Sequence, residues 1–183
     1  MHKYFLATND SVLVVVDIQV RLAAVMSERQ KVIGNSLHLI EAARILRLPV
    51  LLTEQYPKGL GPTVPEIKEA LPSYEPIEKL VFGCCGERAF MEALYSIGKR
   101  KVILCGMETH VCVLQTCLGL IREGYTVHVV QDAICSRTKE NHGIGTEFMR
   151  DAGGVLTGTE TVLFQLLERA GTEEFKLLSK RIR

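Results

Sequence analysis

Five apolar residues in a row, Val12 to Val16, place the strongest constraint on the fold of this chain. An unbroken run of this kind is typical of a parallel strand that is covered on both faces, whereas a half-exposed strand alternates apolar and polar residues. Further strands are predicted at residues 50–53, 77–81, 102–105, 126–130 and 154–156. Helical spacing of apolar residues predicts helices at residues 31–48, 89–97, 109–123, 145–151 and 161–168. Prolines and glycines predict a long loop at residues 54–64.

Strands that alternate with helices in this way predict a three-layer α/β/α fold with a mostly parallel, doubly wound sheet. The length of 183 residues and a hydrophobic fraction of 47% suit one well-buried core. We therefore expect a single domain over residues 1–183. The tail from Glu173 to Arg183 carries Phe175, Leu177, Leu178 and Ile182 among charges. It predicts a solvated terminal helix, with docking on a neighbouring subunit as the alternative.

The formal charge of +1 and the absence of tryptophan disfavour partners that need a basic or stacking surface. We expect a small-molecule substrate, no nucleic acid and no membrane. The first residues lack the apolar run of a signal peptide, so a cytoplasmic location is predicted. The 6 cysteines are then expected to be free thiols.

Three reactive side chains are predicted to meet at one edge of the sheet. Ligands of open α/β sheets bind beyond the carboxyl ends of the strands, where the strand order reverses. If the order is 3-2-1-4-5-6, Asp17, Lys79 and Cys112 all fall on that edge. Taken separately, each has a simpler explanation. Asp17 would be a helix-capping carboxylate, Lys79 a surface lysine and Cys112 a core thiol.

Together, an acid, an amine and a thiol make a covalent mechanism. The thiolate is the attacking form, and a helix start and a lysine ammonium both favour it. We therefore expect a lowered pKa for Cys112, with Asp17 as the general base and Lys79 stabilising negative charge. Backbone amides of the turn at residues 106–112 are candidates for an oxyanion hole.

These residues stand in motifs that resemble a known family. Val15-Val-Asp17-Ile-Gln19, Lys79 with Phe82, and Gly106-Met-Glu-Thr-His-Val-Cys112 are similar to the isochorismatase-like cysteine hydrolases. The resemblance continues through Asp132-Ala133, Ser136-Arg137 and Thr159-Glu160. It implies a Rossmann-like six-strand parallel sheet in the order 3-2-1-4-5-6, a homo-oligomer and a catalytic triad of Asp17, Lys79 and Cys112.

The resemblance also implies details of the turn before the nucleophile. A cis peptide bond is expected between Met107 and Glu108. The amides of Glu108 and Cys112 would form the oxyanion hole, and the Glu108 side chain is expected to be solvated.

The sequence departs from the metal-dependent members of that family. Nicotinamidases carry an Asp-x-His metal motif after the second strand, where this chain has Thr53-Glu54-Gln55. We therefore predict no metal and no cofactor, as in the metal-free branch that includes the isochorismatase-domain-containing proteins. Nicotinamidase activity is a weak alternative. True isochorismatases lack the nucleophilic cysteine, so Cys112 makes their reaction a weak alternative too.

The same resemblance suggests candidates for the substrate pocket. They are Gln19, Gln55, Tyr56, Phe82 and His110. Cys84 and Cys85 are expected to pack as small residues at a helix start, with resolution of an oxidised Cys112 as the alternative.

The sequence thus predicts a metal-independent cysteine hydrolase that cleaves a C–N bond of a small amide or carbamoyl compound through an acyl-enzyme on Cys112. The alternative is a non-catalytic protein that binds a metabolite or a partner on the same scaffold.

Overall fold

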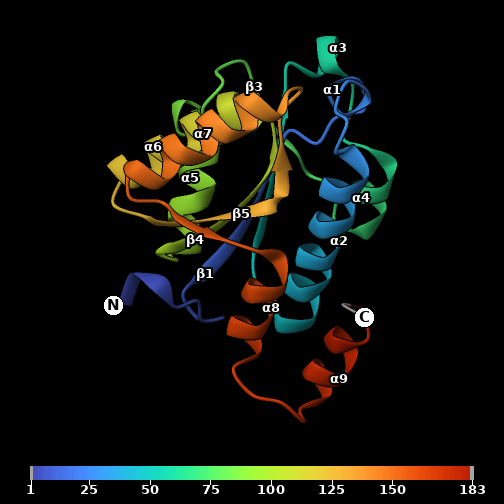
Figure 1. Ribbon diagram of the computed structural model, residues 1–183, viewed down its shortest axis with the longest axis vertical. Coiled ribbons are helices and arrows are strands. Elements are labelled where there is room, and N and C mark those ends of the chain that lie inside the picture. Colours follow the sequence, from blue (N-terminus) through green and yellow to red (C-terminus); the bar gives the residue numbers. More distant parts are fainter. Residues whose placement is uncertain (1, 182–183) are drawn as a thin grey trace.

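A six-stranded sheet, parallel throughout, forms the centre of the protein (Figure 1), which is described here by a computed structural model of residues 2–181. The strand order is β3-β2-β1-β4-β5-β6, so the predicted fold class and order are confirmed. The strands are β1 (Ser11–Val16), β2 (Val50–Gln55), β3 (Ile77–Lys79), β4 (Lys101–Met107), β5 (Thr126–Cys135) and β6 (Val155–Thr157).

Helices connect the strands and cover both faces of the sheet. They are α1 (Val20–Ala24), α2 (Arg29–Leu46), α3 (Pro57–Leu60), α4 (Pro65–Ala70), α5 (Arg88–Ile97), α6 (Leu114–Arg122), α7 (Lys139–Asp151), α8 (Thr159–Leu167) and α9 (Glu173–Ser179). Shorter helical turns are η1 (His2–Tyr4), η2 (Cys84–Gly86) and the π-helical η3 (Thr109–Val113).

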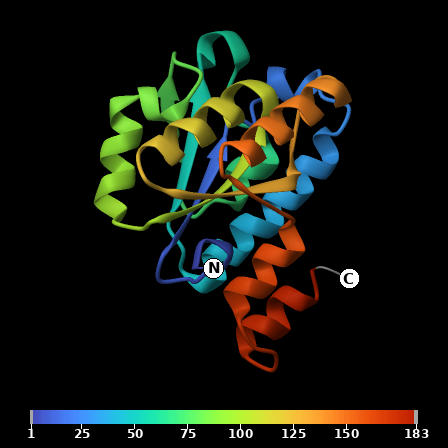
Figure 2. The ribbon, with the colours of Figure 1, turned by 60° about the vertical axis from the view of Figure 1, so that its left-hand side comes forward.

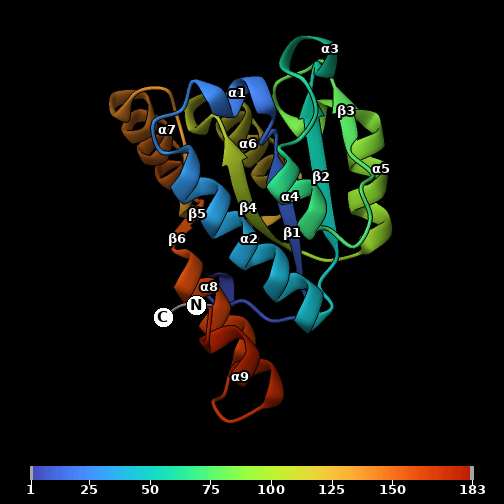
Figure 3. The ribbon, with the colours of Figure 1, turned by 90° about the vertical axis from the view of Figure 1, so that its right-hand side faces the viewer.

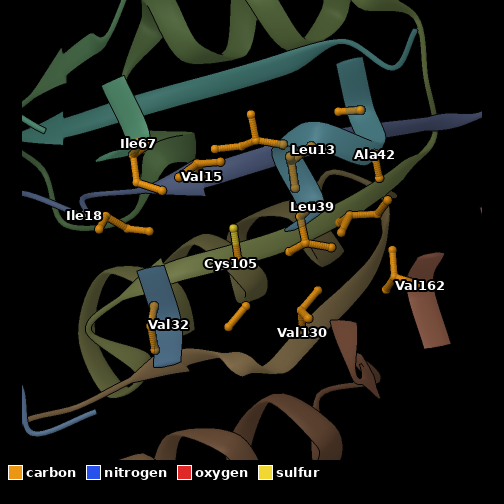
Figure 4. Packing of buried hydrophobic residues seen from close by; sticks show 14 of the residues in the cluster. Leu13, Val15, Ile18, Val32, Leu39, Ala42, Ile67, Cys105, Val130 and Val162 are labelled. Carbon is orange, nitrogen blue, oxygen red and sulfur yellow. The ribbon is translucent and has the colours of Figure 1, made fainter. Parts of the chain in front are cut away.

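The two faces of the sheet carry separate hydrophobic clusters. Helices α2, α4 and α8 lie on one side, and α5, α6 and α7 on the other (Figures 1 and 3). Along β1, Leu13 and Val15 face the first cluster, while Val12, Val14 and Val16 face the second. Figure 4 shows the first cluster, in which β1 residues meet side chains of α2 and α4. Burial on both faces explains why the β1 sequence is apolar at every position from Val12 to Val16.

The observed elements differ from the predicted ones mainly at their ends. The helix predicted at residues 109–123 is divided into η3 and α6, and β5 continues five residues beyond the predicted end, to Cys135. The segment at residues 54–64, predicted to be a loop, contains the end of β2 and the short helix α3. Helices α1 and α4 were not predicted, because each is too short to show helical periodicity.

The terminal helix α9 is anchored to the rest of the molecule. Leu178 is fully buried in the first hydrophobic cluster, and the ring of Phe175 lies 6.4 Å from that of Phe164. In Figure 2, α9 lies against α8 at the end of the molecule that holds both termini. The predicted terminal helix is present and most of its residues are exposed, but α2 and α8 cover one apolar face of it. Ile182 lies outside the described residues.

Candidate active site

The carboxyl ends of β1 and β4 lie side by side at the point where the strand order reverses. Asp17 follows β1 directly and has a φ of 52°, a left-handed conformation that non-glycine residues adopt at an energetic cost. Its amide donates to Thr53 O, and its carbonyl accepts from the amide of Gln19. Gly106 of β4 approaches so closely that a Cβ there would lie 2.0 Å from Val16 O. The backbone is therefore shaped to present Asp17 at the sheet edge.

Lys79 is the last residue of β3, and its side chain is completely buried. Its Nζ donates to Asp17 Oδ2 at 2.7 Å and to Gln55 Oε1 at 2.7 Å. It also donates to the carbonyl oxygen of Phe82 at 2.9 Å. A buried ammonium is tolerated only when its donors are paired in this way. Lys79 is thus an interior ion-pair partner of Asp17 and not a surface lysine.

The second oxygen of Asp17 contacts a residue that the sequence did not single out. Thr53 Oγ1 donates to Asp17 Oδ1 at 2.7 Å. Cys84 Sγ lies 3.9 Å from the same hydroxyl, and burial followed by the charge of Asp17 raises the pKa of Cys84 to about 11. The sequence contained no signal that Thr53 would contact Asp17, because an isolated polar side chain near a strand end is common.

Cys112 lies in η3, a π-helical turn, and only 5% of its surface is exposed. Turns of this type occur often at functional sites. Burial raises the pKa of Cys112, and the charge of Asp17 and hydrogen bonding to it raise it further, whereas Lys79 acts in the opposite direction. The expectation of a lowered pKa is therefore wrong. The sequence indicated the helix start and the lysine, but the depth of the thiol and its nearness to a carboxylate decide the direction.

Glu108 precedes that turn, and the Met107–Glu108 peptide bond is cis. The expectation that its side chain is solvated is wrong, because the residue is buried. Glu108 Oε2 accepts from the amide of Arg137 at 3.0 Å and from its Nε at 3.1 Å. The carboxylate therefore connects the turn that leads to Cys112 with the segment after β5. The role of the Glu108 and Cys112 amides as an oxyanion hole stays a prediction.

Two of the predicted substrate-contacting residues have their side chains engaged by the protein. Gln19 Nε2 donates to the carbonyl oxygens of Gln55 and Gly61, and its Oε1 accepts from the amide of Gln55. Gln55 accepts from Lys79 and donates to Leu80 O at 2.9 Å. Both residues are buried. Their side chains connect β1, β2 and the segment after β3.

The other three predicted contact residues lie nearer to solvent. Tyr56 is 51% exposed and Phe82 is 53% exposed, so neither belongs to the core. His110 Nδ1 lies 2.9 Å from Ser136 Oγ, which joins η3 to the end of β5. A substrate contact by each of these residues stays a prediction.

The side chains next to Asp17 are the ammonium of Lys79, the hydroxyl of Thr53 and the thiols of Cys84 and Cys112. Between residues 2 and 181, no group of three or more His, Cys, Asp or Glu side chains is arranged to hold a metal ion. Over the same range, no helix is both long and apolar enough to cross a membrane.

Comparison with known proteins identifies the relatives of this fold and site. A family model of the isochorismatase domain matches residues 11–161. The chain belongs to the isochorismatase domain family. The secreted isochorismatase effector Isc1 of Phytophthora sojae is 40% identical over 97% of this chain and 87% of its own length. Isochorismatase domain-containing protein 2 of Danio rerio is 38% identical over 96% of this chain and 88% of its own.

Solved structures similar to this isochorismatase domain agree with the observed fold. The MAR1 ribonuclease of Caenorhabditis elegans has a TM-score of 0.91 and 39% identity, and the match covers 97% of this chain and 92% of that one. YcaC of Pseudomonas aeruginosa, solved with covalent acrylamide, has a TM-score of 0.90 and 28% identity, with coverage of 97% and 91%. The YcaC gene product of Escherichia coli, an octameric hydrolase, has the same TM-score and identity, with coverage of 97% and 90%. Membership of this family supports a hydrolase-type enzyme.

Proposed function

We propose that this protein is a metal-independent cysteine hydrolase that cleaves a C–N bond of a small amide or carbamoyl compound through an acyl-enzyme on Cys112. The observation that carries the proposal is the position of the Asp17 carboxylate. It is paired with buried Lys79 at 2.7 Å. After burial, which is the largest cause, it is also the charge that raises the pKa of the Cys112 thiol. One group therefore interacts with both the cation and the nucleophile.

The raised pKa of Cys112 defines the first step. The thiol is protonated at neutral pH, so attack requires that Asp17 accept the proton while sulfur bonds to the carbonyl carbon. The C–N bond then breaks, and the amine leaves with the proton from Asp17. Lys79 donates to Asp17 Oδ2 at 2.7 Å and so holds the carboxylate in place as the proton acceptor.

The second step returns the enzyme to its starting state. Asp17 removes a proton from water as the oxygen bonds to the acyl carbon, the C–S bond breaks, and the proton passes to the Cys112 sulfur. The amides of Glu108 and Cys112 are proposed to bind the developing oxyanion in both steps. Losing one such donor typically costs about 3 kcal/mol in the barrier.

A reactive nucleophile in a relative supports the proposal. The Pseudomonas aeruginosa protein, 28% identical to this chain, was solved with covalent acrylamide, which is an electrophile. Asp17, Lys79 and Cys112 are buried here, which suits a small substrate better than a polymer.

Turnover of a panel of small amides and carbamoyl compounds tests the proposal, with wild type compared with Cys112→Ala and Asp17→Asn. We expect both variants to lose activity by about 10⁴-fold or more if the residues act as a unit. Mass spectrometry of wild type quenched during turnover should find the acyl group on Cys112. Turnover that survives in either variant would remove that residue from the mechanism. Absence of turnover on every compound would favour a protein that binds a metabolite or a partner.

A ribonuclease is a second candidate, because the Caenorhabditis elegans protein that carries this description is 39% identical. A ribonuclease would have to bring a phosphodiester of RNA to a buried site on a chain of formal charge +1. Adding a labelled RNA to the same panel tests it directly. Cleavage that is lost in Cys112→Ala would replace the amidase proposal. Nicotinamide and isochorismate belong in the panel as the weaker alternatives.

The proposed enzyme is a single hydrolase domain over residues 1–183 that forms a homo-oligomer in the cytoplasm. The octameric Escherichia coli relative supports the oligomer, and light scattering of the purified protein measures it. The Phytophthora sojae relative is named as a secreted effector, so localisation in the host cell needs a direct measurement with a fluorescent fusion.

A further inference from the structure

Given the proposed cysteine hydrolase, on which this rests, we infer that Gln55 is a positioning residue for Lys79. It supplies the neutral acceptor that holds the Lys79 amine as an ammonium against Asp17, and Lys79 therefore acts through Asp17 without touching the substrate. Gln55 itself contacts no reacting atom.

The number of protons on Lys79 Nζ decides how many of its neighbouring oxygens can be hydrogen-bonded. A lysine ammonium has three N–H donors, and a neutral lysine amine has two. Nζ has three acceptors within 2.9 Å, Asp17 Oδ2 at 2.7 Å, Gln55 Oε1 at 2.7 Å and Phe82 O at 2.9 Å. The carbonyl oxygen of Val81 lies farther away, at 3.4 Å. Gln55 Oε1 and Phe82 O carry no proton, and neither does Asp17 in its carboxylate form. Beside the Asp17 carboxylate, three acceptors therefore match the ammonium, and a neutral amine would leave one of them unsatisfied.

The orientation of the Gln55 amide is fixed by its neighbours. Its Nε2 donates to Leu80 O at 2.9 Å, so its Oε1 must be the atom that faces Lys79. The backbone of Gln55 is held on both sides by Gln19, whose Oε1 accepts from the Gln55 amide at 2.8 Å and whose Nε2 donates to its carbonyl at 3.0 Å. A reversed amide would place two donors against each other at Lys79 and two acceptors against each other at Leu80.

The hydrogen bonds of Lys79 also keep its N–H groups from the substrate. Because all three N–H groups of Lys79 point at protein oxygens, no donor remains for a substrate oxyanion. The ammonium is also fully buried beneath these groups. The charge of Lys79 therefore affects the reaction by acting on Asp17, and backbone amides bind the oxyanion. The buried Gln55 amide is likewise occupied at both ends, which separates it from a residue that binds substrate.

Detection of the Lys79 ammonium by ¹⁵N–¹H NMR of lysine-labelled full-length protein tests the inference. Protected ammonium protons exchange slowly enough to be seen, whereas those of surface lysines exchange rapidly at neutral pH. We expect one protected signal in wild type, assigned by its absence in Lys79→Met. Gln55→Met preserves length and removes the acceptor, so the protected signal should be lost. Gln55→Glu keeps an oxygen acceptor, so the signal should persist. Gln30→Met, an exposed position on α2, is the matched control and should change nothing.

Kinetics separate positioning from substrate binding. Where a substrate is in hand, Gln55→Met should lower kcat by roughly tenfold or more with KM unchanged, since it disturbs the catalytic pair and not the bound substrate. A raised KM with an unchanged ammonium signal would show that Gln55 binds substrate and would overturn the inference. So would a wild-type Lys79 without a protected signal. If the Met variant fails to fold, loss of the signal in Gln55→Glu overturns it. The NMR result stands without any substrate, so failure of the amidase proposal is distinguishable from failure of this one.

Discussion

Asp17 and Lys79 form an ion pair in which Oδ2 and Nζ are 2.7 Å apart and neither side chain is exposed to solvent. Arg88 and Glu92 on α5 form a pair with the same separation, but on the surface, with side chains 89% and 61% exposed. The two pairs allow one geometry to be compared in two environments. Burial removes the screening by water that weakens surface pairs, and it makes an unpaired charge costly.

Breaking the buried pair on one side is expected to destabilise the protein strongly. Asp17→Asn and Lys79→Met should each lower the free energy of unfolding by about 3–5 kcal/mol, because each leaves an uncompensated buried group. The double variant should cost less than the sum of the two, since it removes both charges. Urea unfolding measures this cycle. The matching cycle on Arg88 and Glu92 should give no measurable coupling, and additive costs at the buried pair would contradict the expectation.

The thiol of Cys112 is expected to react slowly at neutral pH. Its pKa is raised by burial and by Asp17, so alkylation by iodoacetamide should increase with pH and reach half its maximum well above the ordinary thiol value of about 8.5. Asp17→Asn removes the carboxylate and its hydrogen bond, and should lower that midpoint even as it abolishes turnover. Peptide mass spectrometry distinguishes Cys112 from the other five thiols. A wild-type midpoint at or below about 8.5 would contradict the raised pKa.

Much of the fold and the positions of Asp17, Lys79 and Cys112 were predictable from sequence for one reason. Parallel strands buried on both faces leave continuous apolar runs, and polar residues at their carboxyl ends meet at one edge of the sheet. Asp17 after β1 and Lys79 at the end of β3 follow this rule, as does Cys112 in the turn beyond β4. Local pattern and topology were sufficient there.

The contacts that complete the site depend on distances that no local pattern contains. Glu54 was assigned to a loop, yet it is buried, and its Oε1 accepts from the Thr63 amide, the Thr63 hydroxyl and the Tyr74 hydroxyl. Thr53 contacts Asp17 because β1 and β2 are adjacent in the sheet. The direction of the Cys112 pKa was missed for the same reason, since it depends on depth and on one carboxylate.

His128 is expected to make stability fall in acid. Burial, with a smaller contribution from Lys101, lowers the pKa of His128 to about 4 from its ordinary 6.5. Below pH 6.5 the unfolded chain binds a proton that the folded chain refuses until about pH 4. The contribution of neutral His128 to the free energy of unfolding is therefore complete above pH 6.5. It decreases as the pH falls towards about 4, by about 3 kcal/mol for this shift.

Replacement by glutamine isolates that effect. His128 Nε2 lies 2.9 Å from Lys3 O, and a glutamine amide supplies a donor for that carbonyl without titrating. Urea midpoints at about pH 7.5 and about pH 4.5 should differ less in His128→Gln than in wild type. His38 and His142, whose pKa values are also lowered by burial, contribute equally to both proteins. Equal pH dependence of the two would rule His128 out as the cause.

Gly106→Ala should be among the most damaging single substitutions in the chain. Gly106 has a φ of 130°, and a Cβ built there would lie 2.0 Å from the carbonyl oxygen of Val16, the residue before Asp17. That contact involves backbone on both sides, so relief requires β1 and β4 to separate at the candidate site. We expect a loss above about 4 kcal/mol in the free energy of unfolding, or no folded protein.

Gly98→Ala is the matched control for that substitution. Gly98 also has a positive φ, 68°, but a Cβ placed on it would have no atom within 4 Å, because Gly98 ends α5 in open space. The cost there is conformational alone, about 1–2 kcal/mol. Urea unfolding of both variants therefore separates the strain of a left-handed residue from the collision at the sheet edge. Similar costs at the two glycines would mean that β4 does not press against β1 beside Asp17.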